Sequence, residues 1–182
     1  MSAATPDAVA SRAFAIASVI KPSDFIGQGS RQCLDACRDI VAATTGVPAN
    51  LAAQNVGHIN MAFEVNKQYV PAPQAAHGIE TINKFLEAGK PIVVGVSKWT
   101  GGKPYNTSNP ATEHFVVIVG RGEDKNGKFY LFYDVGTQRP TLGTSRDNKL
   151  YLLQNRLLAG RTQYATSTPN YTLTEVRPYK YD

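Results

Sequence analysis

The chain has few of the features that mark disulfide-rich, membrane-spanning or disordered proteins. It contains 2 cysteines, 1 tryptophan and 3 histidines in 182 residues. Two cysteines cannot build the disulfide framework of a small secreted domain. No stretch approaches the roughly 18 apolar residues of a membrane helix. A charged fraction of 18% beside 42% hydrophobic residues excludes an extended disordered chain. We therefore expect one folded domain over residues 1–182.

The first residues also lack the features of a secretion signal. No Lys or Arg precedes Arg12, and polar residues interrupt the apolar positions before Ile20. We expect a protein without a signal peptide that is cytoplasmic at synthesis. The formal net charge is +5, but Lys and Arg are scattered and no nucleic-acid motif is present. We expect neither nucleic-acid binding nor membrane insertion.

The first half of the chain has the apolar spacing of helices. Residues 7–20 and Arg31–Thr45 each carry one apolar face, and a third such face lies on residues 79–86. Ser30 is suited to cap the second helix at its start, and Gly46 is suited to end it. We therefore expect the helices to come first in the chain.

From residue 90 onward, short apolar runs replace the helical spacing and predict strands. The segment Asp124–Gly127 is typical of a hairpin turn. The predicted strands are Pro91–Val96, His114–Gly120, Phe129–Asp134, Leu150–Leu153 and Thr172–Tyr179. Helices followed by an antiparallel sheet indicate an α+β fold.

Cys33 is the candidate nucleophile. It falls in the first turn of a predicted helix, directly after a glycine-rich turn. Unpaired backbone N–H groups and the positive end of the helix dipole favour a thiolate there. Cys37 lies one turn further along, on the apolar face, and we expect it in the core.

His114 and Asp134 are the candidate partners of that cysteine. His114 opens one strand of the predicted hairpin, and Asp134 ends the other. Because the far ends of a hairpin meet, the two side chains should lie close together. A carboxylate can then orient the imidazole, which in turn takes the thiol proton.

These residues resemble the papain-like cysteine peptidases, and are most similar to the double-glycine leader peptidase domains of bacteriocin-exporting ABC transporters. The resemblance rests on the runs Gln28–Cys37 and His114–Gly120 and on the pair Tyr133–Asp134. It implies a papain-like α+β fold, with N-terminal helices packed on a small antiparallel sheet. It also implies Cys33 as nucleophile and His114 as general base and then general acid.

The same resemblance implies that Asp134 orients the histidine and that Gln28, with the Cys33 backbone N–H, forms the oxyanion hole. Gln28 lies five residues before Cys33, where the family usually has six, and Gln32 is a second candidate. Leu34 stands where the family commonly has glycine. These departures leave the identity of the substrate open.

A stand-alone basic domain with this pattern is also similar to the papain-like effectors that bacteria deliver into rivals through type VI secretion. That similarity implies an antibacterial toxin, a leaderless export route and an immunity protein that blocks the cleft.

The expected function is cleavage of a peptide bond in a protein through a thioester, without cofactor or metal. Trp99, on the long polar loop 99–112, is expected to line the substrate groove. His58 and His77 lack metal-ligand spacing. The pattern leaves open a peptidoglycan amidase or endopeptidase, a cysteine-dependent deamidase or transferase, and a non-catalytic binding module.

Overall fold

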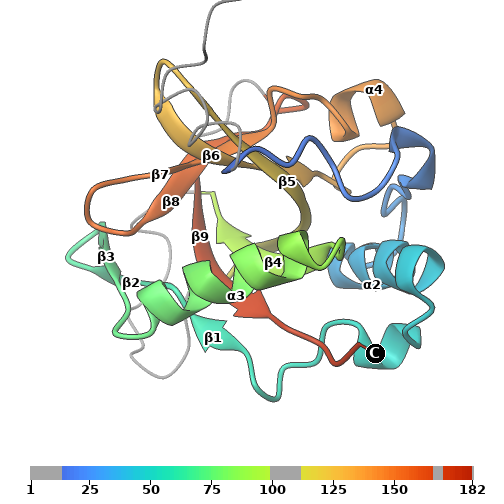
Figure 1. Ribbon diagram of the computed structural model, residues 1–182, viewed down its shortest axis with the longest axis horizontal. Coiled ribbons are helices and arrows are strands. Elements are labelled where there is room, and N and C mark those ends of the chain that lie inside the picture. The colour runs from blue at the N-terminus through green and yellow to red at the C-terminus, as the bar shows by residue number, and fades with distance from the viewer. Residues whose placement is uncertain (1–13, 99–111, 166–169, 182) are drawn as a thin grey trace, which may run out of the picture.

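The computed structural model describes residues 14–98, 112–165 and 170–181 (Figure 1). Its strands are β1 (Ile59–Asn60), β2 (Ala62–Val65), β3 (Gln68–Pro71), β4 (Ile92–Ser97), β5 (His114–Asp124), β6 (Gly127–Tyr133), β7 (Lys149–Leu152), β8 (Leu158–Arg161) and β9 (Tyr171–Arg177). Its helices are α2 (Cys33–Thr45), α3 (Ala75–Glu87) and α4 (Pro140–Gly143), with short 3-10 turns η1 (Pro22–Asp24) and η2 (Ala49–Leu51).

An antiparallel sheet that closes on itself forms the body of the molecule. Its strands follow the order β9-β4-β5-β6-β7-β8, and β8 pairs again with β9. These six strands therefore form a closed barrel. The short β1 adds to β9 from outside the ring, while β2 and β3 form a separate hairpin.

The helices α2 and α3 both contact β4 and β5 of this barrel (Figure 1). Every residue of β4 is buried, because one face of the strand lies inside the barrel and the other lies under the helices. Such two-sided burial explains its continuous apolar run. Ile40 and Val41 of α2 and Ile82 of α3 are fully buried in the same core.

The expected papain-like α+β fold, with N-terminal helices on a small sheet, is wrong. The described residues form mostly sheet, and the sheet is a closed ring with three α-helices around it. The expected helix over residues 7–20 does not extend through its described part. Instead, Ile16 forms a β-bridge with Arg121 of β5. Residues 7–13 of that prediction lie outside the described ranges.

Several elements were nevertheless predicted close to where they lie. The helix expected over Arg31–Thr45 is α2, and Gly46 ends it with a left-handed φ of 76° that glycine adopts easily. The N-cap residue is Gln32, so the assignment of Ser30 was wrong. The sheet is antiparallel as expected, but the prediction missed β8, the strand that closes it.

Candidate active site

Cys33 is the first residue of α2 and is partly exposed. The helix's first internal hydrogen bonds run from the N–H groups of Asp35 and Ala36 to the Gln32 carbonyl. The N–H groups of Cys33 and Leu34 precede these bonds, as is usual in a first helical turn. A thiolate at this position therefore meets the positive end of the helix.

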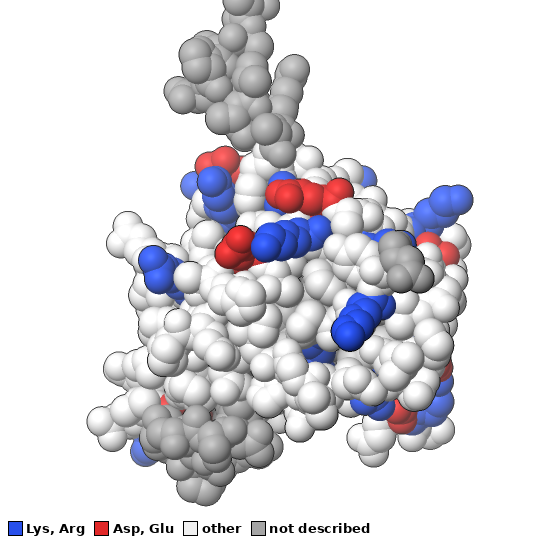
Figure 2. All heavy atoms as spheres, turned by 60° about the horizontal axis from the view of Figure 1, so that its bottom comes forward, with Lys and Arg blue, Asp and Glu red and all other residues white. Residues whose placement is uncertain are grey.

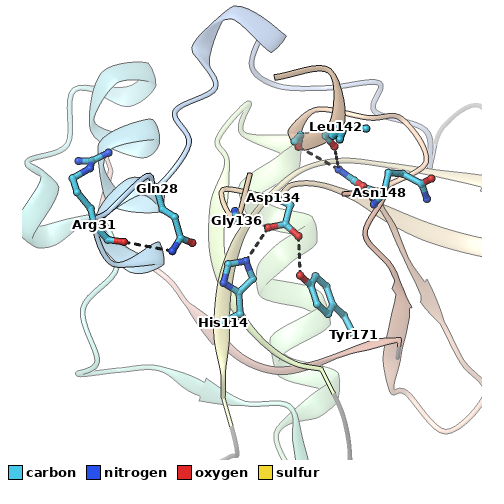
Figure 3. Close-up of polar contacts among 10 residues, drawn as sticks. Gln28, Arg31, His114, Asp134, Gly136, Leu142, Asn148 and Tyr171 are labelled. Carbon is cyan, nitrogen blue, oxygen red and sulfur yellow. Dashed lines mark hydrogen bonds and ion pairs between the residues drawn. The ribbon is translucent and has the colours of Figure 1, made fainter. Parts of the chain in front are cut away.

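His114 and Asp134 form a hydrogen bond of 2.8 Å between Nε2 and Oδ1 (Figure 3). Both side chains are withdrawn from water, with exposed fractions of 6% and 0%. An ionised carboxylate can only accept hydrogen bonds, so Nε2 carries the proton of this bond. The other ring nitrogen, Nδ1, is then left for the Cys33 thiol, with which His114 also interacts.

A β-bulge sets the geometry of this pair. The β5–β6 register shifts by one residue between Ile118 and Gly120. On the His114 side of this shift, Val117 pairs with Tyr133. One step further along both strands, Asp134 lies opposite Val116. Val116 and His114 are two residues apart on one strand, so Asp134 lies on the same face of the sheet as His114. Without the extra residue, the carboxylate would lie on the opposite face, because a one-residue slip reverses every side chain.

The Asp134 carboxylate receives hydrogen bonds on both oxygens. Oδ1 accepts from His114 and from the N–H of Gly136 at 2.9 Å, and Oδ2 accepts from the Tyr171 hydroxyl at 2.9 Å (Figure 3). Burial acts to raise the pKa of Asp134, but the hydrogen bond and charge of His114, helped by the Thr162 side chain and the Gly136 N–H, hold it below its usual value. The carboxylate is therefore ionised and fully satisfied in a buried place.

The backbone around Asp134 is held from two sides. The Asp134 N–H donates to the carbonyl of Gly143 in α4 at 2.8 Å, and the Gln28 N–H donates to the carbonyl of Val135 at 2.8 Å. The second bond ties the turn before Cys33 to the end of β6. It therefore links the backbone that carries the thiol to the backbone that carries the carboxylate.

Cys33 and His114 shift each other's ionisation. Burial acts to raise the pKa of the Cys33 thiol, but the hydrogen bond and charge of His114, helped by the backbone of Phe115 and Leu34, lower it. Burial acts to lower the pKa of His114, but Asp134 and Cys33 raise it to about 9. The arrangement favours a thiolate beside an imidazolium at neutral pH, the reactive form of a nucleophilic cysteine.

The structure thus brings Cys33, His114 and Asp134 together. Gln28 is partly buried, and its side-chain amide donates to the carbonyl of Arg31 at 3.4 Å (Figure 3). Trp99, expected in the substrate groove, lies outside the described residues. Cys37 is fully buried in the core, and burial raises the pKa of its thiol well above the usual value.

Tyr171 and Tyr164 are residues at this site that sequence reasoning missed. Tyr171 donates to Asp134, and Tyr164 interacts with Tyr171. The Tyr164 ring lies against Gly136, where an added Cβ would come within 2.5 Å of the phenolic oxygen. No local signal marks either tyrosine, because both reach the site only through the closure of the sheet.

One face of the molecule carries mixed charges. On the face drawn in Figure 2, Lys and Arg are interspersed with Asp and Glu among uncharged residues.

Within the described ranges, no group of three His, Cys, Asp or Glu side chains is placed to hold a metal ion. None of the helices in those ranges is long and apolar enough to cross a membrane.

Comparison with known proteins identified no relative. No protein-family model matches the chain, and no match was found among the curated proteins or the solved structures.

Proposed function

We propose that this protein is a cysteine hydrolase that cleaves a peptide bond in a protein substrate. The observation that carries the proposal is a partly exposed thiol that interacts with an imidazole, whose other nitrogen is hydrogen-bonded to a buried carboxylate. Nucleophilic catalysis by cysteine requires these three groups in this order. The proposal concerns these residues and not a papain-like fold.

The reaction would proceed in two halves. The Cys33 thiolate attacks the carbonyl carbon, and the carbonyl π electrons move to oxygen. The His114 imidazolium then protonates the leaving amine as the C–N bond breaks, which leaves a thioester on Cys33. Neutral His114 next takes a proton from water, and the hydroxide formed attacks the thioester. Cys33 leaves as thiolate and the acid product is released. Asp134 stays ionised and orients the imidazole throughout.

The oxyanion formed in each half requires hydrogen-bond donors. The N–H groups of Cys33 and Leu34 precede the first hydrogen bonds of α2 and are therefore suited to this role. The Gln28 side chain remains a candidate for a further donor. It would have to exchange its long hydrogen bond with Arg31 for one with the substrate.

A direct test compares two single-cysteine variants, Cys33→Ala and Cys37→Ala. Each protein is incubated with unfolded protein substrates and with purified peptidoglycan sacculi, and the products are analysed by mass spectrometry. We expect new peptide ends with the wild type and with Cys37→Ala, and none with Cys33→Ala. Acid quenching during turnover should trap an acyl adduct on the peptide that contains Cys33.

Other products would select other functions. Release of stem-peptide fragments from sacculi would indicate the amidase or endopeptidase alternative, and a mass gain of about one dalton without cleavage would indicate deamidation, since an amide is replaced by an acid. Undiminished cleavage by Cys33→Ala would overturn the proposal. Absence of any product, with Cys33 no more reactive than free cysteine, would favour a binding module. The effector role and the immunity protein remain predictions.

A further inference from the structure

Tyr171 is a buried residue outside the expected triad that contacts it directly. It is the first residue of β9, and only 1% of the residue is exposed. Its hydroxyl donates to Asp134 Oδ2 at 2.9 Å, while His114 binds the other carboxylate oxygen (Figure 3). Asp134 therefore lies between the imidazole and the phenol and is hydrogen-bonded to both.

Both oxygens of the buried carboxylate need donors, since a desolvated charge without them is costly. Oδ1 already accepts from His114 and from the Gly136 N–H, whereas Oδ2 accepts from the Tyr171 hydroxyl. If that donor were lost, rotation about the Cβ–Cγ bond would be the simplest way for Oδ2 to reach another one. The same rotation would move Oδ1 away from His114.

Tyr171 is itself held firmly. Its backbone pairs with Gly160 at the junction where β8 closes the barrel onto β9. Its ring lies 5.9 Å from Phe132 and 6.0 Å from His114, centroid to centroid. Burial, the charge of Asp134 and the neighbouring Tyr164 raise the pKa of Tyr171 far above its usual value. The phenol therefore stays protonated and remains a donor.

We propose that Tyr171 is a positioning residue for the hydrolysis proposed above: its hydroxyl holds Asp134 Oδ2 so that Oδ1 stays directed at His114. The inference rests on the proposed function for its catalytic meaning. The orientation of Asp134 toward His114 can be tested without any substrate, through the pKa of His114.

The test is Tyr171→Phe, which removes only the hydroxyl. Tyr130→Phe is the matched control. Tyr130 is also fully buried, and the substitution also removes one hydrogen bond, the one from the Tyr130 hydroxyl to Asn83 at 2.8 Å. The pKa of His114 is followed by NMR of labelled histidine, with His114→Gln used to assign its signal among the three histidines. The charged groups that face His114 are Cys33 and Asp134.

We expect Tyr171→Phe to lower the pKa of His114 from about 9 by roughly one unit, and Tyr130→Phe to leave it unchanged. With a cleavable substrate, kcat should fall about ten-fold in Tyr171→Phe at unchanged KM. A pKa of His114 that stays constant or rises in Tyr171→Phe would overturn the inference, whether or not the protein proves to be a hydrolase.

A second variant keeps the inference testable if Tyr171→Phe does not fold. Tyr164 is partly exposed and interacts with the Tyr171 hydroxyl. Tyr164→Phe should therefore fold, and it should hold the Tyr171 hydroxyl less firmly against Asp134. We expect a smaller decrease in the pKa of His114. No decrease in this variant would then count against the role of Tyr171. Loss of hydrolysis in every protein, with the His114 shift present, would contradict only the proposed function.

Discussion

His114 lies between two groups that both favour its charged form: Asp134 Oδ1 is 2.8 Å from Nε2, and Cys33 interacts with the same ring. The pair with Asp134 is almost fully removed from water. Electrostatic interactions are stronger in such surroundings than at the surface. The ionisation of the Cys33 thiol therefore depends on a carboxylate that acts through the histidine.

The first prediction concerns the reactivity of Cys33 toward iodoacetamide. Because His114 lowers the pKa of this thiol, the thiolate should persist at pH values where free cysteine, with a pKa of about 8.5, is protonated. The alkylation rate at pH 6.5 should exceed that of free cysteine by about ten-fold or more, and should fall as the pH decreases through the lowered pKa. Peptide mass spectrometry after timed quenching gives the rate at each pH.

His114→Gln is the informative comparison for that experiment. It removes the imidazolium, so the pH dependence of alkylation should return toward that of an ordinary thiol. A wild-type profile already centred near the free-cysteine value would contradict the thiolate–imidazolium pair.

The second prediction concerns Asp134→Asn. The amide keeps the size of the side chain but loses the charge that stabilises the imidazolium, and its NH2 group is not an acceptor for His114. We expect kcat/KM for peptide cleavage to fall by roughly 10²- to 10⁴-fold. The exposed Asp147→Asn is a suitable control and should retain activity. Equal activity of the two variants would exclude a role for Asp134 in orienting the histidine.

The third prediction concerns stability against pH, in a Cys33→Ala background that removes the titrating thiol. A group whose pKa is raised by folding stabilises the folded state fully below its unfolded pKa, about 6.5 for histidine, and loses this effect as the pH rises through the folded value. In the wild type that value is about 9. Asp134 is still present in Cys33→Ala, so it continues to raise the pKa of His114.

The free energy of unfolding of Cys33→Ala should therefore decrease between pH 6.5 and 9, by on the order of 2 kcal/mol. Urea titrations at several pH values measure this change. The double variant Cys33→Ala/His114→Gln should show a flatter dependence over the same interval. A dependence that is identical in both proteins would mean that His114 is not stabilised in its charged form.

The fourth prediction concerns the closure of the barrel at Gly160. A Cβ built at this residue would lie 1.7 Å from the backbone carbonyl oxygen of Lys149 on β7, a group that cannot move aside freely. Gly160→Ala should lower the free energy of unfolding by more than about 2 kcal/mol. Ala159→Ser, one position earlier and only partly buried, should cost little. Similar melting temperatures for the two variants would contradict this packing.

The position of Asp134 shows how far the sequence could predict the site. The hairpin turn and the strand ends that bring His114 and Asp134 near each other were recognisable from residues 114–134. The bulge between Ile118 and Gly120 was not, although it decides that both side chains lie on one face. At Gly120 the carbonyl of Ile16 approaches so closely that a Cβ would be only 2.6 Å away, so this position also depends on a contact distant in sequence.

The fold prediction failed at residues that make contacts distant in sequence. Arg31–Thr45 and the strand ending in Val96 follow local apolar patterns, and both were recognised. The segment Leu158–Arg161 is a short strand of mixed character, and its pairing with both β7 and β9 closes the ring. Because of that pairing the sheet is a closed barrel, whereas we expected a small open sheet.

Local signals along the chain were enough to predict a helix close to its true bounds and ending at Gly46, and a hairpin with His114 and Asp134 at its base. Three further features became visible only in three dimensions: the sheet closes, a bulge brings Asp134 to the same face as His114, and Tyr171 binds the second carboxylate oxygen. Apolar spacing and turn residues depend on neighbours along the chain, whereas strand closure and side-chain hydrogen bonds depend on how distant backbones fit together in space.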